Sequence, residues 1–414
     1  MMHVKIYHSI RRRRLAFFFA ALIAGLNLSP VFGQQQRPRR VGANEQQQSQ
    51  PTVTPNAAED VDDGETVRVE TQLVSVPVSV TDRGGRMIGK LRAEDFSLYE
   101  DGRLQQITNF MTTDAPFEVA LLLDTSGSTR AQLALIRRAA NAFLAALRPG
   151  DRVSIVAFHT AEEEGNKLAA VEVKTKLTSD RDELRQAVES IGASSGTPFY
   201  DALARTVDEV FKEPAAPEMS GRRALVALTD GVDSTSDSDY VEARAALIRA
   251  GIACYFVQVS TEDFVEERLM RDCEDDGTLQ LSRAQLKRYR KIYAPRADAG
   301  DYQDFCRMGP FQRMQISRDL YNLARREMAD LARVSGGSIT VADDLNEARR
   351  AFAQVAANIG TQFSLGYYPT NKARDGRYRA IRVEVKDAAQ RGGAAAGGAP
   401  LTVRAREGYY APKG

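Results

Sequence analysis

The sequence predicts an α/β fold: a doubly wound, mostly parallel sheet inserted in a discontinuous all-β domain of the sandwich type. Two observations predict the sheet. Continuous apolar runs such as Val119–Leu123 and Ala224–Thr229 are typical of strands buried on both faces, and helical patterns separate these runs along the chain. A third observation predicts the surrounding domain, because apolar and polar residues alternate at 74–81 and again beyond residue 360.

The first apolar run ends at an acidic residue that two serines follow. Asp124 comes directly after Leu123, and Ser126 and Ser128 stand at the next alternate positions. Open α/β sheets bind ligands at the carboxyl ends of their strands, so we expect Asp124 at that edge. A carboxylate and two hydroxyls close together are hard oxygen donors that suit Mg²⁺, Mn²⁺ or Ca²⁺. The loop is therefore a candidate cation site.

Two later stretches carry further oxygen donors. Thr197 lies in a Gly-Thr-Pro turn before a helical pattern, and Asp230 ends the run 224–229 in a Thr-Asp-Gly turn. Together with Asp-x-Ser-x-Ser at 124–128, these stretches resemble the metal-ion-dependent adhesion site of the von Willebrand factor type A (VWA) family. The resemblance implies direct coordination by the hydroxyls, with the aspartates mostly holding metal-bound waters. The candidate ligands are Asp124, Ser126, Ser128, Thr197 and Asp230.

The resemblance also implies a binding function. Neutral hydroxyls leave a divalent cation under-neutralised, and a unit charge of opposite sign at ~4 Å is worth on the order of 4 kcal/mol at an effective dielectric of about 20. An open coordination position would therefore attract an Asp or Glu carboxylate of a partner protein. We expect Mg²⁺, with Mn²⁺ or Ca²⁺ as alternatives, in a protein-binding module that is not an enzyme.

Each stretch taken alone also has a structural interpretation. Ser128 or Thr129 could cap the helix that follows, Thr197 could cap the next one, and Thr229-Asp-Gly is a common turn. Two other functions stay open. The ion could act as a Lewis acid in a hydrolase, with Asp233 and acids of a later insertion as the candidate bases. The protein could also be a metal-free envelope scaffold.

The remaining elements of the central region follow from the period of the apolar residues. A helical stripe runs from Leu133 to Leu147, and Asp180 is expected to open another helix. The alternating run 171–177 is expected to be an antiparallel edge strand. Further strands are expected at 152–158, 252–259 and 337–341, and further helices at 199–211, 240–250, 316–334 and 344–359. This alternation of strands and helices is typical of a doubly wound sheet.

A charged connection separates the strand 252–259 from the helix 316–334. Residues 262–315 are rich in Asp, Glu, Arg and Lys. One interpretation is a solvated excursion at the surface. The other follows from position, because the connection leaves the carboxyl edge beside the strand that bears Asp230 and could overhang the cation. In that case a short turn in place of 262–315 would change partner binding and leave the metal affinity intact.

Strand patterns flank the VWA-like region, 117–359, on both sides. In the first flank Pro77 indicates an edge or a bulge, and Asp101-Gly102 indicates a hairpin. The flanks 67–116 and 360–414 are expected to pair with each other and form one β-domain. The resemblance extends to them, because their Glu-Asp-Phe-Ser-Leu-Tyr, Leu-Gly-Tyr-Tyr-Pro and Arg-Glu-Gly-Tyr-Tyr-Ala-Pro motifs are similar to a bacterial envelope group called VWFA-related proteins.

The N-terminal residues 1–33 are predicted to be a secretory signal peptide. Four arginines precede the apolar stretch Leu15–Leu28, and cleavage is expected between Gly33 and Gln34. The alternative is an uncleaved N-terminal anchor. Residues 34–66 are polar and are expected to form a flexible tether. We therefore expect a periplasmic or secreted protein without a membrane span after the signal is removed.

Composition argues against two functional classes. Without residues 1–33 the chain carries 51 basic and 55 acidic residues, a balance that gives no reason to expect a nucleic-acid partner. His159 is then the only histidine. A Ser-His-Asp hydrolase would have to be built around this one residue, so we do not expect that chemistry.

The three cysteines suggest one disulfide. Cys254 lies inside the apolar run 252–259 and is expected to be a buried thiol. Cys273 and Cys306 lie in the charged connection, and their pairing would close a loop of about 33 residues, worth roughly 3–4 kcal/mol in the chain-entropy model. Peptide mapping without reductant tests the pairing, because two free thiols at these positions would contradict it.

Overall fold

The computed structural model describes residues 73–84, 86–112, 115–126, 133–163, 166–213, 215, 222–270, 281–342, 345–386 and 401–413. They belong to one compact unit, Arg68–Gly414. The predicted signal peptide and tether lie outside the described residues, and so do Ser128 and Cys273.

A six-stranded sheet forms the centre of the fold. Its strands are β5 (Glu118–Leu123), β6 (Arg152–Glu163), β7 (Asn166–Val173), β8 (Arg223–Thr229), β9 (Ala253–Val259) and β10 (Ser338–Ala342). The strand order is β10-β9-β8-β5-β6-β7, and only the β6–β7 pair is antiparallel. The predicted doubly wound, mostly parallel sheet is confirmed. β5 has β6, the next strand along the chain, on one side and β8 on the other, so the strand order changes direction there. Open α/β sheets bind ligands at such a switch point.

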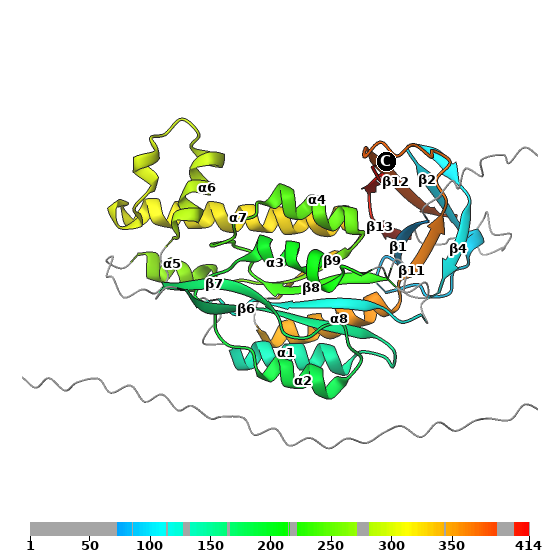
Figure 1. Ribbon diagram of the computed structural model, residues 1–414, viewed down its shortest axis with the longest axis horizontal. Coiled ribbons are helices and arrows are strands. Elements are labelled where there is room, and N and C mark those ends of the chain that lie inside the picture. Colours follow the sequence, from blue (N-terminus) through cyan, green and yellow to red (C-terminus); the bar gives the residue numbers. More distant parts are fainter. Residues whose placement is uncertain are drawn as a thin grey trace, which may run out of the picture. The chain divides into compact units, whose positions relative to one another are not determined.

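Helices cover both faces of this sheet (Figure 1). The helices α1 (Leu133–Ala145), α2 (Arg181–Glu189) and α8 (Leu345–Gly360) lie on one face, and α3 (Phe199–Arg205), α4 (Tyr240–Ala250) and α7 (Pro310–Ser335) lie on the other. Every residue of β5 and β9 is buried, as the continuous apolar runs predict. Each face of the sheet has its own apolar cluster with the helices that cover it.

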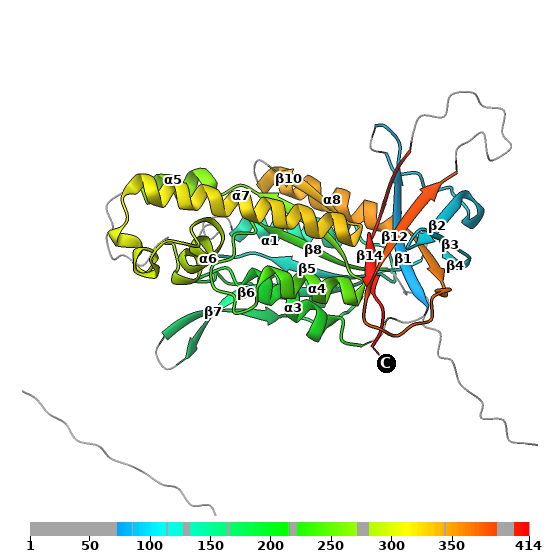
Figure 2. The same ribbon diagram turned by 90° about the horizontal axis from the view of Figure 1, so that it is seen from above.

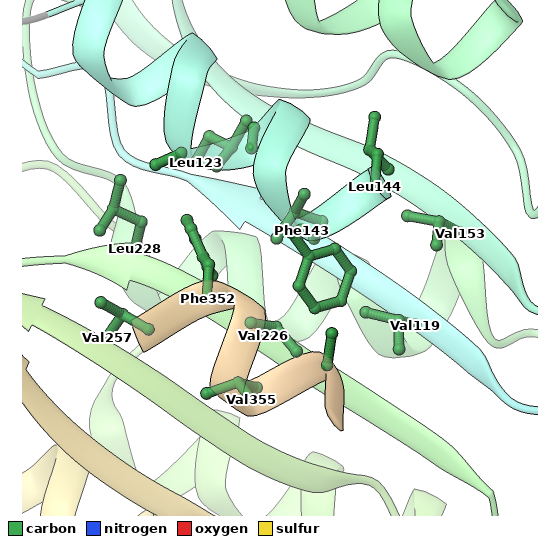
Figure 3. Packing of buried hydrophobic residues seen from close by; sticks show 14 of the residues in the cluster. Val119, Leu123, Phe143, Leu144, Val153, Val226, Leu228, Val257, Phe352 and Val355 are labelled. Atoms are coloured by element: carbon green, nitrogen blue, oxygen red, sulfur yellow. The ribbon is translucent and has the colours of Figure 1, made fainter. Parts of the chain in front are cut away.

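Phe352 on α8 is buried in the cluster that α1, α2 and α8 form with the sheet (Figure 3). Its ring meets that of Phe143 on α1 edge to face, with 5.9 Å between the centroids. Phe352→Ala removes this buried ring and leaves a cavity, so we expect a loss of about 3–5 kcal/mol in the free energy of unfolding. Urea denaturation measures it. The matched control is Phe311→Ala, because Phe311 is 74% exposed; a similar loss in both variants would contradict the expectation.

Two elements on these faces have limits that differ from the prediction. The edge strand is antiparallel as expected, but β7 covers Asn166–Val173 because β6 continues to Glu163 and pairs with it along its whole length. The helix expected at 199–211 ends as α3 at Arg205 and continues as a π-helical turn, Thr206–Val210. The Thr206 hydroxyl donates to the carbonyl oxygen of Ala202 at 2.8 Å, a bond that competes with regular helical pairing.

The charged connection after β9 is helical and has a core of its own. It contains α5 (Glu262–Leu269), α6 (Arg283–Tyr293) and the first turns of α7, which begins at Pro310 and not at residue 316. Apolar residues from these three helices and from the segments between them are buried together, namely Val265, Leu269, Leu281, Leu286, Phe305, Met308, Ile316, Leu320 and Tyr321. The interpretation as a solvated excursion is therefore wrong for its described residues.

Two antiparallel sheets form the second part of the fold (Figure 2). Their strands are β1 (Val74–Thr81), β2 (Phe96–Glu100), β3 (Arg103–Gln105), β4 (Ile107–Met111), β11 (Phe363–Tyr367), β12 (Tyr378–Val385), β13 (Thr402–Ala405) and β14 (Gly408–Tyr410). The orders are β13-β1-β11-β4 and β14-β12-β2-β3. Each sheet combines strands from before and after the central sheet, through the pairs β1–β11 and β2–β12 among others, which confirms the predicted pairing of the flanks. The residue numbers at which the domains divide stay a prediction.

Local signals in the first flank act as expected, with one difference. Asp101 and Gly102 form a two-residue hairpin turn with φ values of 47° and 79°. Pro77 does not mark an edge strand, because β1 lies between β13 and β11. However, β13 pairs with β1 only from Val78 onward, so Pro77 has a neighbouring strand on one side alone. Its missing N–H is tolerated there.

The thiol of Cys254 is free and buried, and burial raises its pKa to about 12. Cys273 lies outside the described residues, so its pairing with Cys306 stays a prediction. In the part of the chain that the structure describes, no helix combines the length and the apolar character that a membrane span requires.

Candidate functional site

The candidate site begins where β5 and β8 end side by side. Asp124 follows β5, is only 1% exposed and donates its amide to the Leu228 carbonyl oxygen at 3.0 Å. Its Oδ2 accepts a hydrogen bond from the Thr229 hydroxyl at 2.6 Å, and its Oδ1 accepts one from the Ser126 amide at 3.0 Å. These bonds hold the Asp124 carboxylate at the switch point of the sheet.

Burial makes this carboxylate costly to ionise. Desolvation raises the pKa of Asp124, and the groups that act against the rise are the Thr229 hydroxyl and the hydroxyl and amide of Ser126. These donors carry no net charge. A divalent cation beside Asp124 would supply the positive charge that such donors lack.

Asp230 is held in a similar way after β8. The carboxylate is 5% exposed; its Oδ1 accepts from the Val232 amide at 3.0 Å and its Oδ2 from the Thr261 hydroxyl at 2.6 Å. Gly231, between Asp230 and Val232, has a φ of 74°, and a Cβ there would lie 2.6 Å from the methyl carbon of Met328 on α7. The turn therefore needs glycine for its backbone angle.

Thr197 reaches the same region through backbone contacts. Its amide donates to the Ser234 hydroxyl at 2.8 Å, and the Ser234 amide donates to the Thr197 carbonyl oxygen at 3.0 Å. The loop before α3 is thus tied to the loop after Asp230. The alternative role of Thr197 as a helix cap is wrong, because α3 begins after Pro198 without a side-chain cap and Asp233 accepts bonds from the first helical amides instead.

The loop after β5 is anchored beyond Asp124. The Thr125 hydroxyl donates to the Phe158 carbonyl oxygen at 3.0 Å, and the Ser194 amide donates to the Thr125 carbonyl oxygen at 2.7 Å. Ser126 is 3% exposed. Ser128 lies outside the described residues, so neither its role as a ligand nor its alternative role as a cap is observed.

Several side chains that hold the site were not among the predicted residues. Thr229 and Thr261 each donate to a candidate aspartate, and Ser234 links two of the loops. A sequence signal exists for the first two, because each is a threonine where a buried strand ends. Asp233, named above as a candidate base, caps α3, and burial raises its pKa to about 6.

The donor set is made of oxygen atoms. Among the described residues, no group of three or more His, Cys, Asp or Glu side chains is arranged to hold a metal ion. A cation at this edge would therefore depend on hydroxyl oxygens beside the two aspartates. Carboxylate and hydroxyl oxygens fit Mg²⁺, Mn²⁺ or Ca²⁺, and they do not fit a soft metal that requires thiolate or imidazole ligands.

A model of the von Willebrand factor type A domain matches residues 118–280. Among solved structures, the chain is similar to the conserved hypothetical protein BatB from Bacteroides thetaiotaomicron, with 20% identity over 59% of this chain and 98% of that one, and a TM-score of 0.36. It is also similar to a von Willebrand factor type A protein from Catenulispora acidiphila, with 14% identity, coverage of 76% and 73%, and a TM-score of 0.39. The vWF domain of the type V pili tip protein Mfa5 from Porphyromonas gingivalis shows 17% identity, coverage of 29% and 39%, and a TM-score of 0.23. No curated protein sequence matches the chain.

Proposed function

We propose that this chain, in which residues 118–280 match the VWA domain, is an extracytoplasmic module that binds another protein through a divalent cation. VWA domains typically serve protein interaction or adhesion. Mg²⁺ is the ion we propose, with Mn²⁺ or Ca²⁺ as alternatives. The proposed ligands and water-holding residues are Asp124, Ser126, Ser128, Thr197 and Asp230.

One observation carries this proposal: two buried aspartates lie at the ends of adjacent strands, and hydroxyl and amide groups donate hydrogen bonds to both carboxylates. Asp124 is bonded to Thr229, the residue directly before Asp230. Thr197 joins this region through its paired backbone contacts with Ser234. Ordinary core packing gives no reason to bury carboxylates at the ligand-binding edge of a sheet, whereas cation binding does.

The partner contact follows from charge. The hydroxyls in the proposed set are neutral, so a bound dication keeps part of its charge and attracts an Asp or Glu carboxylate of the partner. At a distance of ~4 Å and an effective dielectric of about 20, such an attraction is on the order of 4 kcal/mol before desolvation. The cation would supply this attraction, and the chain's own residues would fix its position.

Features near the site favour binding over hydrolysis. Asp233 uses its carboxylate to cap α3, so it is not free to act as a general base. Residues 192–196 read Gly-x-Ser-x-Gly, the pattern of a serine nucleophile turn, but Ser194 at its centre is fully buried. Its hydroxyl donates to the carbonyl oxygen of Gly196 at 2.8 Å. Ser194 therefore holds the loop before Thr197.

The proposal is tested by affinity capture from a cell-envelope extract of the source organism. Wild type, Asp124→Ala and the surface control Asp208→Ala are compared with Mg²⁺ and with a chelator. We expect a partner that wild type and the control capture only with Mg²⁺ and that Asp124→Ala does not capture. A partner captured equally with chelator would contradict the metal-dependent function and favour the metal-free scaffold.

A further inference from the structure

We infer that Thr261 and Tyr321 are positioning residues of the proposed cation site, so that the connection after β9 is part of the site. The inference rests on the proposed function. Thr261 follows β9, and Tyr321 lies on α7, so both come from sequence beyond the five candidate residues. Neither residue is proposed to touch the cation.

The hydrogen bonds among these residues have a fixed direction. The Thr261 hydroxyl donates to Asp230 Oδ2 at 2.6 Å, and the Tyr321 hydroxyl lies 2.6 Å from Thr261 Oγ1. A carboxylate only accepts, so the single hydroxyl hydrogen of Thr261 points to Asp230. The hydrogen between Thr261 and Tyr321 must then come from the tyrosine. The relay runs from Tyr321 through Thr261 to Asp230.

This relay is buried and leaves the carboxylate little freedom. Thr261, Tyr321 and Asp230 are 6%, 4% and 5% exposed, respectively. The second oxygen of Asp230 accepts from the Val232 amide, so both oxygens of the carboxylate are oriented. Groups behind the ligands of metal sites fix ligand orientation in this manner, and their loss typically lowers metal affinity by roughly 10–100-fold.

The charged connection holds the tyrosine in place. Tyr321 is buried in the cluster that α5, α6 and α7 form, and Val232 from the loop after Asp230 packs against the same cluster. The Ser282 hydroxyl at the start of α6 also donates to the Ser234 carbonyl oxygen. Removal of 262–315 is therefore expected to lower the metal affinity, in contrast to the expectation from the sequence alone.

Calorimetry with MgCl₂ and MnCl₂ on the full chain tests the relay. We compare Thr261→Val, which removes the hydroxyl with little change in volume, with Thr261→Ser and Tyr321→Phe. The control Thr206→Val removes a fully buried hydroxyl that bonds only within its own helix. We expect Thr261→Val to weaken Mg²⁺ binding by at least about 10-fold and Tyr321→Phe to weaken it less, while Thr261→Ser and the control stay within about 2-fold of wild type.

A merely structural role would not change the choice between metals. Mg²⁺ demands a stricter ligand geometry than larger cations, so Thr261→Val should lower the ratio of Mg²⁺ to Mn²⁺ affinity as well. Equal Mg²⁺ affinities for Thr261→Val and Thr206→Val would overturn the inference and leave the proposed function standing. No binding of either ion to wild type would instead remove the proposed function.

A different observation, the charge on the exposed face of α6, supports a second inference. Arg283, Lys287 and Lys291 follow one another at intervals of four residues, so they lie on one side of the helix. All three side chains are exposed, and none of them makes an ion pair or a hydrogen bond to another described residue. Like charges four residues apart repel, and a cation in the first turn opposes the helix dipole. Helix stability therefore does not explain this row of three cations, Arg283, Lys287 and Lys291, which we call the stripe.

The stripe starts beside the candidate site. Ser282, the residue before Arg283, bonds to the Ser234 carbonyl, and Ser234 holds Thr197. Arg283 to Lys291 spans roughly 12 Å of helix. We propose that the stripe binds an acidic segment of the partner protein whose first carboxylate completes the shell of the cation. This proposal also rests on the proposed function.

Fluorescence anisotropy with two labelled eight-residue peptides tests the stripe. Both peptides carry one Asp, and only one of them carries three further Glu residues. With Mg²⁺ we expect wild type to bind the acidic peptide at least about 10-fold tighter than the other. The difference should vanish in the triple variant Arg283→Glu, Lys287→Glu, Lys291→Glu. It should persist in the control triple variant Lys90→Glu, Arg138→Glu, Arg349→Glu, which changes the net charge equally.

Three results would contradict the proposal that the stripe binds an acidic segment. Equal affinity of wild type for the two peptides would overturn it, and so would a difference that survives in the α6 variant. A single-stranded oligonucleotide that binds wild type more tightly than the acidic peptide, independently of Mg²⁺, would assign the stripe to nucleic acid instead. Peptide binding that a chelator does not weaken would count against the proposed function itself.

Discussion

Replacement of Gly337 by alanine is expected to lower the free energy of unfolding by about 3 kcal/mol or more. Gly337 lies between α7 and β10, and its amide donates to the Ala332 carbonyl oxygen at 2.9 Å. A Cβ at this position would lie 1.9 Å from the carbonyl oxygen of Cys254 and 2.6 Å from its carbonyl carbon. Both contacts are with the backbone of β9, an internal strand of the sheet, so no side chain can turn away to make room.

Denaturation by urea, followed by circular dichroism, measures this loss. The matched control is Gly192→Ala, because a Cβ at Gly192 would meet no heavy atom within 4 Å. That variant is expected to remain within about 0.5 kcal/mol of wild type. Similar midpoints for Gly337→Ala and wild type would mean that Gly337 does not lie as close to the backbone of β9 as described.

The sequence predicts the central sheet well because local and tertiary preferences agree there. Asp180 is an N-cap residue by type, and its carboxylate accepts bonds from the amides of Asp182 and Glu183 as expected. The apolar runs in β5, β8 and β9 are buried because a parallel sheet covered by helices has no solvated face. The pairing of the flanks was also predictable, since neither flank is large enough to bury its own apolar face.

The charged connection was harder to predict because its core is discontinuous in sequence. Leu269, Leu286 and Phe305 are far apart along the chain and meet only in the folded structure. Charged residues between them dominate the local composition and hide the pattern. One signal was present: Gly309-Pro310 has the glycine before and the proline at the first position that begin many helices.

The candidate site also has one part that the sequence predicts and another that it does not. Asp124 and Asp230 can be placed from the sequence, because each ends a buried strand and strand ends share one edge of the sheet. The partner of Asp230 could not be predicted in full. Thr261 stands at a strand end and is accessible to the same reasoning, but Tyr321 reaches it across 60 residues through the packing of α7. Tertiary contacts of this length leave no periodic signal.

Asp124→Asn is expected to separate stability from metal binding. In wild type, burial raises the pKa of the Asp124 carboxyl, so its ionised form is costly without a cation. The amide has nearly the same shape and no charge. Without divalent ions, removal of the buried charge should offset the loss of the one hydrogen bond that the amide NH₂ group cannot accept, so the variant should be about as stable as wild type at pH 7. At an Mg²⁺ concentration of about 100 times its Kd, wild type should gain about 2.7 kcal/mol, and the variant should gain nothing measurable.

Urea denaturation of both proteins, with chelator and at increasing MgCl₂ concentrations, gives the free energy of unfolding of each protein without and with Mg²⁺. Asp208→Asn serves as the control, because this exposed carboxylate lies at the end of α3 away from the candidate residues; it should respond to Mg²⁺ as wild type does. An equal gain from Mg²⁺ in Asp124→Asn and wild type would show that the ion binds elsewhere. An Asp124→Asn protein much less stable than wild type in chelator would show that the carboxylate serves the fold without a cation, through its charge or through the second hydrogen bond that it accepts.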